Sequence, residues 1–157
     1  MQRSAAQELV AELEMLFSSL SRTGTALADG ALTTTQRLAL IELVDGGSLR
    51  LGALADRIGA ADPTVSRAID GLVEAGIVER QTDPDDRRAT LQVATAKGEG
   101  WVARRRGEVT AALDEALARL APAERDRLVR LVGKLNAALQ PTDSGQSLRY
   151  PALLASR

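Results

Sequence analysis

Apolar residues recur at helical spacing along most of the chain. The first helix is predicted over residues 5–28, where Leu9, Leu13, Leu16 and Leu20 alternate between steps of four and three. A stripe this narrow is typical of a seam against another helix rather than of a broad face on a core. The N-terminal helix is therefore expected to pack against a second helix along its length.

The central part of the chain combines short helices with short extended pieces. Thr33 and Gln36 have the spacing of a capping box, which predicts a helix that begins there and ends at Gly46–Gly47. An extended piece over 48–51 follows. A brief helix then runs to Gly59.

The next helix and a pair of strands complete this central region. Asp62 is predicted as the N-cap, Pro63 as the first helical residue and Gly76 as the C-terminal stop. Two alternating segments follow, at 77–81 and 90–94, and their separation predicts a hairpin.

Two long helices and a tail form the rest of the chain. Thr95 is predicted to cap a helix over 96–120, and Pro122 starts the last helix. The apolar face of that last helix contains Leu128, Leu131, Val132, Leu135, Ala138 and Leu139. The segment 141–157 loses this periodicity and is expected to be mobile.

The order of elements predicts a mainly α fold with a small β-hairpin wing. A winged helix-turn-helix lobe over 33–95 lies between helical regions at 5–32 and 96–140, which are expected to form a dimerisation region. With 157 residues the chain is long enough for a real core, and 45% hydrophobic but only 2% aromatic residues make that core aliphatic.

Composition excludes several classes of chemistry. The chain has no cysteine, which excludes disulfides, thiolate catalysis and thiol-based redox sensing. It has no histidine, which removes the commonest general base and the commonest metal ligand. No enzyme activity, cofactor or metal is therefore expected. Acidic residues interrupt the N-terminal segment and no apolar run reaches about 20 residues, so a cytoplasmic protein without a membrane partner is expected.

Charge argues mildly against a nucleic-acid partner. The 20 basic and 21 acidic residues nearly cancel, so no global field attracts phosphate. Any DNA interface must then depend on a few well-placed contacts.

The helix after Asp62 nevertheless has the pattern of a recognition helix. Its apolar residues fit one buried face, and the outward residues are Thr64, Ser66, Arg67 and Asp70. Arginine can form a bidentate pair with guanine, and the hydroxyls can bond a phosphate or a base edge. Alternatively, the hydroxyls reflect helix-start propensity and Arg67 is merely solvated.

The hairpin tip contains three carboxylates and two arginines: Asp83, Asp85, Asp86, Arg87 and Arg88. An arginine suits a narrow minor groove, and a neighbouring carboxylate can hold its side chain in one orientation. The alternative is a polar turn selected only for its turn chemistry.

The run "LRLGALADRIGAADPTVSRAIDGLVEAGIVERQTDPDDRRATLQVATAKGE" resembles the MarR family of bacterial transcriptional regulators. The likeness covers the helix-turn-helix, the wing with its Asp-x-Arg signature and the start of the following helix. The flanking helices also fit in length and order, so the resemblance extends over residues 5–140. It implies a homodimer that binds double-stranded DNA at a palindromic operator, usually as a repressor. It also implies release of DNA by a small aromatic or lipophilic ligand.

The resemblance also implies roles for particular residues. Arg88 would enter the minor groove, next to Arg87, with Asp86 orienting it. The major-groove and phosphate positions would be Thr33, Thr34, Thr35, Thr64, Ser66 and Arg67. The expected ligand cleft includes Phe17, Leu20 and Trp101, although the aromatic residues could equally be ordinary core.

Some features leave alternatives open. The peroxide-sensing and zinc-sensing branches of the family use cysteine or histidine, and the chain has neither. The three arginines of "ARRRG" at 103–107 are expected to be solvated or to form intersubunit ion pairs rather than to bind phosphate. The alternative function is a winged-helix module that binds proteins without sequence-specific DNA binding.

Overall fold

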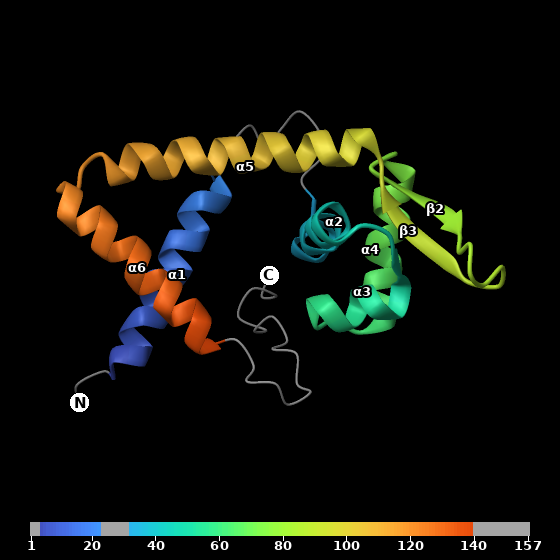
Figure 1. Ribbon diagram of the computed structural model, residues 1–157, viewed down its shortest axis with the longest axis horizontal. Coiled ribbons are helices and arrows are strands. Elements are labelled where there is room, and N and C mark those ends of the chain that lie inside the picture. Colours follow the sequence, from blue (N-terminus) through green and yellow to red (C-terminus); the bar gives the residue numbers. More distant parts are fainter. Residues whose placement is uncertain (1–3, 23–31, 140–157) are drawn as a thin grey trace.

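The computed structural model describes residues 4–22 and 32–139 (Figure 1). The elements in chain order are α1 (Ala5–Arg22), α2 (Thr34–Gly46), β1 (Leu49–Arg50), α3 (Leu51–Ile58), α4 (Asp62–Glu74), β2 (Val78–Thr82), β3 (Thr90–Ala94), α5 (Ala96–Leu117) and α6 (Pro122–Leu139). This confirms the predicted fold class, which is mainly helical with a small wing. The predicted end of the first helix at residue 28 and the predicted mobile tail lie outside the described residues.

A compact aliphatic core lies in the central lobe, where α2 packs against α3, α4 and α5. The core consists of Ala39, Leu40, Leu43, Leu54, Ala55, Ile58, Val65, Ile69, Leu72, Ile77, Val78 and Val102. Trp101 packs against its edge. Burial of these side chains is the main force that holds the lobe together.

The sheet has three strands in the order β1-β3-β2, and both pairings are antiparallel. The hairpin pairs Val78 with Ala94 at its base and Thr82 with Thr90 at its outer end. The extended piece predicted over 48–51 is β1, which pairs with β3 through two residues only. The short strand was predicted, but its pairing with the hairpin was not, and this pairing adds an edge that connects the wing to the start of α3.

Local capping explains most of the helix limits. Thr33 and Gln36 form the predicted capping box, and Thr95 accepts a hydrogen bond from the Gly98 N–H as the N-cap of α5. The prediction for α4 is wrong by one residue. The carbonyl of Ala61, not of Asp62, accepts the first helical hydrogen bonds, so Ala61 is the N-cap and Asp62 lies in the first turn.

The long helices leave the lobe. In Figure 1, α5 runs from the wing at one end of the molecule to the region of α1 and α6 at the other. No residue of 4–20 is buried, and neither is any residue of α6. The exposed large apolar residues are Leu9, Val10, Leu13, Met15, Leu16, Phe17, Leu120, Leu128, Val129, Leu131, Val132, Leu135 and Leu139.

Candidate nucleic-acid interface

The first turns of α4 present polar side chains on the surface of the lobe. Thr64 and Arg67 are exposed, and Ser66 is half-buried. The opposite face is buried through Val65, Ala68, Ile69 and Leu72, as predicted. This arrangement leaves the N-terminal part of the helix free to enter a major groove, where such residues contact base edges.

Asp70 lies one turn further along α4 and is exposed, as predicted. Its Oδ1 accepts a hydrogen bond from the Nη2 of Arg80, on β2, at 2.5 Å. The ion pair connects α4 to the wing and neutralises the Asp70 carboxylate. Arg80 was not among the predicted site residues, because nothing in its local sequence pairs it with a residue ten positions earlier.

The wing loop presents two arginines. Arg87 and Arg88 are both exposed between the ends of β2 and β3. Within residues 4–22 and 32–139, no salt bridge engages either guanidinium. Both cations are therefore available to an external partner.

Asp86 contacts Arg88 in a different way from the one predicted. Its Oδ1 accepts a hydrogen bond from the backbone N–H of Arg88 at 3.1 Å, rather than from the guanidinium. The physical reason is the two-residue separation, which favours a local turn closed by the side-chain oxygen. Asp86 therefore shapes the loop backbone from which the arginine extends.

The arginine that a wing carboxylate does hold is Arg50, on β1. Its Nε donates to Oδ2 of Asp83 at 2.7 Å, and its Nη2 lies 2.6 Å from the same oxygen. The hydrogen bond from the backbone N–H of Asp85, followed by the one from Arg50, lowers the pKa of Asp83. In turn, the hydrogen bond to Asp83 raises the pKa of Arg50. This pair joins residues 33 positions apart, and the sequence pattern offered no signal for it.

The threonines that begin α2 differ in their surroundings. Thr33 is exposed and accepts the Gln36 N–H, while Thr34 is half-buried and accepts a hydrogen bond from Arg37 at 3.2 Å. Thr35 is also half-buried. A helix N-terminus with free amide groups favours phosphate, so this end of α2 is chemically suited to a backbone contact.

The arrangement of these elements has relatives of known structure. The model of the MarR family matches residues 32–90, from the start of α2 to the first residue of β3. Residues 32–90 are a MarR-family domain. The region matched includes every predicted DNA-contacting residue named above.

Solved structures extend the likeness to the long helices. RV1404 from Mycobacterium tuberculosis is 26% identical, with a TM-score of 0.78 over 90% of this chain and 98% of its own. A MarR family protein from Bacillus stearothermophilus is 22% identical, with a TM-score of 0.74 over 90% and 99%. BpsR from Bordetella bronchiseptica, whose DNA binding is regulated by 6-hydroxynicotinic acid, is 22% identical, with a TM-score of 0.63 over 91% and 96%. The chain as a whole thus has the fold of a MarR-family regulator.

The arginine triplet Arg104–Arg106 contributes to contacts between helices of this chain. Arg105 donates to the carbonyl oxygen of Leu20, on α1, at 2.5 Å, and Arg106 bonds Asp45, on α2, at 2.6 Å. Arg106 forms an ion pair, but its partner Asp45 lies in the same chain and not in a second subunit, as the prediction of intersubunit ion pairs had it. Both contacts hold α5 against the elements beside it.

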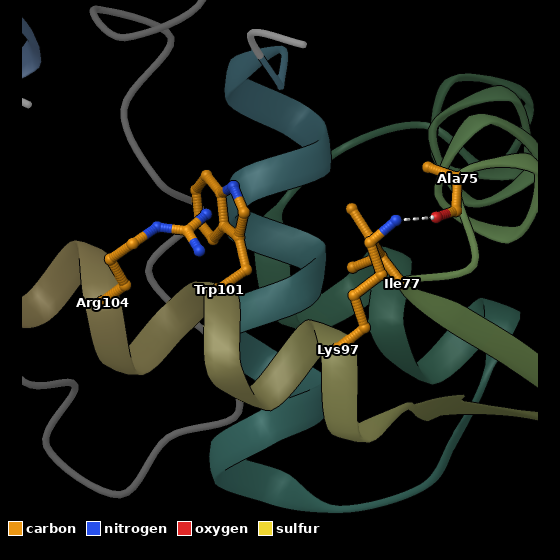
Figure 2. A pocket seen from close by; sticks show the side chains of 5 residues that line it. All are labelled: Ala75, Ile77, Lys97, Trp101 and Arg104. Atoms are coloured by element: carbon orange, nitrogen blue, oxygen red, sulfur yellow. Dashed lines mark hydrogen bonds between the residues drawn. The ribbon is translucent and has the colours of Figure 1, made fainter. Parts of the chain in front are cut away.

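A hollow of about 230 Å³ lies where α5 meets the end of α4 (Figure 2). It is lined by Ala75, Ile77, Lys97, Trp101 and Arg104. The Nζ of Lys97 donates to the carbonyl oxygen of Ala75 at 2.8 Å, and the Arg104 side chain lies beside the indole in Figure 2. Neither Phe17 nor Leu20 lines this hollow, so the structure does not bring the three predicted ligand residues together there.

Two further observations concern classes of partner. Among the described residues, no group of three or more carboxylates could hold a metal ion. None of the helices that the structure describes is long and apolar enough to cross a membrane.

Proposed function

We propose that this MarR-family chain is a cytoplasmic, sequence-specific DNA-binding regulator that acts as a homodimer, most simply as a repressor. The observation behind the proposal is the pairing of two exposed cationic elements on one lobe. Arg67 projects from the start of α4, and Arg87 and Arg88 project from the wing. An interface of this kind needs few charges, which agrees with a net charge of only −1.

Each element has a distinct role in the proposed complex. Arg67 forms a bidentate pair with a guanine in the major groove, and Thr64 and Ser66 bond neighbouring base edges or phosphates. Arg88 enters the minor groove, where a narrow width favours arginine, and Arg87 lies beside it. Thr33, Thr34 and Thr35 bring the N-terminus of α2 to the phosphate backbone.

The homodimer follows from the apolar surfaces outside the lobe. The side chains of Leu13, Leu16, Leu131 and Val132 are each about half exposed. Contiguous apolar surface of this extent is typical of an interface, and two copies joined by a two-fold axis would bury it. A two-fold dimer presents two α4 helices to half-sites one or more helical turns apart, which makes the operator palindromic.

A small aromatic or lipophilic effector is part of the proposal. The hollow beside Trp101 is comparable with a cavity that binds one benzene ring, and Lys97 and Arg104 add positive charge at its edge. BpsR offers a precedent, since 6-hydroxynicotinic acid regulates its DNA binding. A ligand that drew Lys97 away from Ala75 would loosen the end of α4. Because Trp101 is the only tryptophan, quenching of its fluorescence by benzoate would measure such binding.

Selection of bound fragments from genomic DNA tests the proposal most directly. A regulator enriches a few palindromic sites, and its affinity for them falls steeply as salt is raised. A winged-helix module that binds only proteins would enrich no sequence and would show no salt-dependent shift on duplex DNA. That second result would replace the proposed function with the alternative.

A further inference from the structure

The wing loop extends beyond the paired part of the sheet. The last paired residues are Thr82 and Thr90, so residues 83–89 lie outside the ladder. Most of this loop is exposed, whereas Asp83 is only 5% exposed. A two-stranded ribbon is marginally stable in water, so the β2–β3 pairing alone leaves the direction of the tip weakly determined.

Asp83 ties the loop together from its first position. Its backbone N–H donates to the carbonyl oxygen of Ala89 at 3.0 Å, which closes the neck of the loop. Its Oδ1 accepts the backbone N–H of Asp85 at 2.9 Å. Its Oδ2 remains for the guanidinium of Arg50, which supplies both Nε and Nη2.

Arg50 belongs to a different part of the lobe. It lies in β1, which joins the sheet through two residue pairs only, and it is also the N-cap residue of α3. The helix α3 packs directly against α4. The ion pair therefore connects the wing loop to the helix-turn-helix. It adds to the β1–β3 pairing, which contains two residue pairs only.

We propose that Arg50 and Asp83 form a clamp that fixes the wing loop, beyond the part of β2 that the Arg80–Asp70 ion pair connects to α4, and that Asp83 is a positioning residue for DNA binding through Arg88. The inference rests on the proposed function. Arg67 on α4 and Arg88 on the wing can reach adjacent grooves of one duplex only when the distance between the two elements is fixed. A held wing also loses less conformational entropy when its arginine inserts.

Simple electrostatics gives the opposite expectation. A carboxylate near phosphate repels it, so removal of any wing aspartate should tighten binding. Asp85 is the matched control, because it is exposed and lies in the same loop. The described residues show no ion pair for its side chain. Both residues are aspartates of the same loop, but only Asp83 forms the ion pair with Arg50.

The first measurement uses the free protein. Amide hydrogen exchange at Asp85 and Ala89 should be faster in Arg50→Gln than in the wild type, because release of the guanidinium loosens the loop. Arg57→Gln is the control, since Arg57 has a similar exposure and its ion pair with Glu42 lies away from the wing. Equal exchange in all three proteins would overturn the clamp.

The second measurement is affinity for a mixed-sequence DNA duplex at one fixed salt concentration. Asp83→Asn should weaken binding by about three- to tenfold. This loss is smaller than the one expected for Arg88→Ala, because the arginine is still present but is less well positioned. Asp85→Asn should bind as tightly as the wild type or more tightly. In combination with Arg88→Ala, Asp83→Asn should add no further loss, because the side chain it positions is gone.

The outcomes separate the hypotheses. Tighter binding by Asp83→Asn, or a loss that adds fully to that of Arg88→Ala, would overturn the positioning role; full additivity would mean that Asp83 only stabilises the lobe. If the wild type binds no duplex at all, the proposed function fails. Amide exchange would then still establish whether the clamp holds the wing.

Discussion

Arg67 and Arg88 project from different elements of the lobe, so their side chains have different tasks in the proposed complex. Arg67 lies in the first turns of a helix with a buried opposite face, so its side chain is exposed and would enter the major groove in the proposed complex. Arg88 lies at the tip of a ribbon, where Asp86 accepts its backbone N–H and its side chain remains exposed. The first arginine can distinguish bases, and the second responds mainly to groove width.

The Arg67→Ala variant tests the first of these tasks. We expect it to lose about 1–3 kcal/mol of binding free energy on the operator and to accept more sequences at the position it contacts. The measurement is affinity for the selected operator and for a mixed-sequence duplex at the same salt concentration. Equal losses on both duplexes would show that Arg67 contacts only phosphate.

The Asp83 carboxyl gives the wing a defined pH dependence. Backbone and Arg50 hydrogen bonds lower its folded-state pKa below the ordinary value of about 3.9. Its contribution to stability is therefore complete above that ordinary value and is lost as the pH falls through the lowered pKa. The chain has no histidine, so we expect the wing to keep its structure from pH 8 to pH 5.

The chemical shift of the Asp83 carboxyl carbon measures this pKa directly. In the wild type its titration midpoint should lie below the ordinary value for an aspartate, because hydrogen bonds stabilise the ionised form. In Arg50→Gln the midpoint should move upward, because the guanidinium, one of the groups that stabilise the ionised form, is removed. An unchanged midpoint would mean that the Arg50 contact does not persist in solution.

At the scale of elements, the start of α5 is docked on the junction between α4 and β2. The hydroxyl of Thr95 donates to the carbonyl oxygen of Gly76 at 2.8 Å, and Lys97 bonds Ala75. Gly98 is buried, and a Cβ there would collide with the carbonyl oxygen of Ile77. These contacts join the start of α5 to the turn that follows α4.

Two glycine substitutions in α5 test this docking. Gly98→Ala should reduce the free energy of unfolding by about 1–3 kcal/mol, since the collision is with backbone that cannot move aside. Gly100→Ala is the matched control, because nothing lies within 4 Å of its Cβ position. It should stabilise the helix by up to about 1 kcal/mol. Thermal or denaturant unfolding measures the free energy of unfolding of both variants. Similar values for the two would contradict the close contact between Gly98 and the carbonyl oxygen of Ile77.

At the scale of the whole molecule, the buried core is confined to the lobe and the base of α5. Among the described residues, the apolar side chains of α1 and α6 given above are exposed, and a part-buried hydrogen bond from Arg105 to the carbonyl oxygen of Leu20 joins α1 to α5. A second copy of the chain would bury these surfaces. A mutation on the exposed faces of α1 or α6 should therefore change the oligomeric state without changing the stability of the lobe.

The Leu131→Lys variant tests this separation. A charge within the apolar face of α6 should convert the dimer to a monomer at micromolar concentration, while the lobe keeps its unfolding transition. Ala137→Lys adds the same charge on the opposite side of the helix and should remain dimeric. Sedimentation velocity measures both. A wild type that sediments as a monomer with full helicity would contradict the proposed assembly.

The sequence alone predicted the order of the elements, most of their limits and the buried face of α4. These features depend on interactions between residues close along the chain. A capping box needs Thr33 and Gln36 three positions apart, and the face of a helix repeats every three or four residues. The exposed position of Arg67, Arg87 and Arg88 followed from the same local rules.

The tertiary structure decided which charged groups meet. Arg50 and Asp83 are 33 positions apart, and Arg80 meets Asp70 because β2 turns back beside α4. The aspartates of the wing tip were predicted to hold the neighbouring arginines, yet the one buried carboxylate holds an arginine from β1. A long cationic side chain can reach several acids, and only the packing of the elements brings one within hydrogen-bond distance and excludes water from the pair.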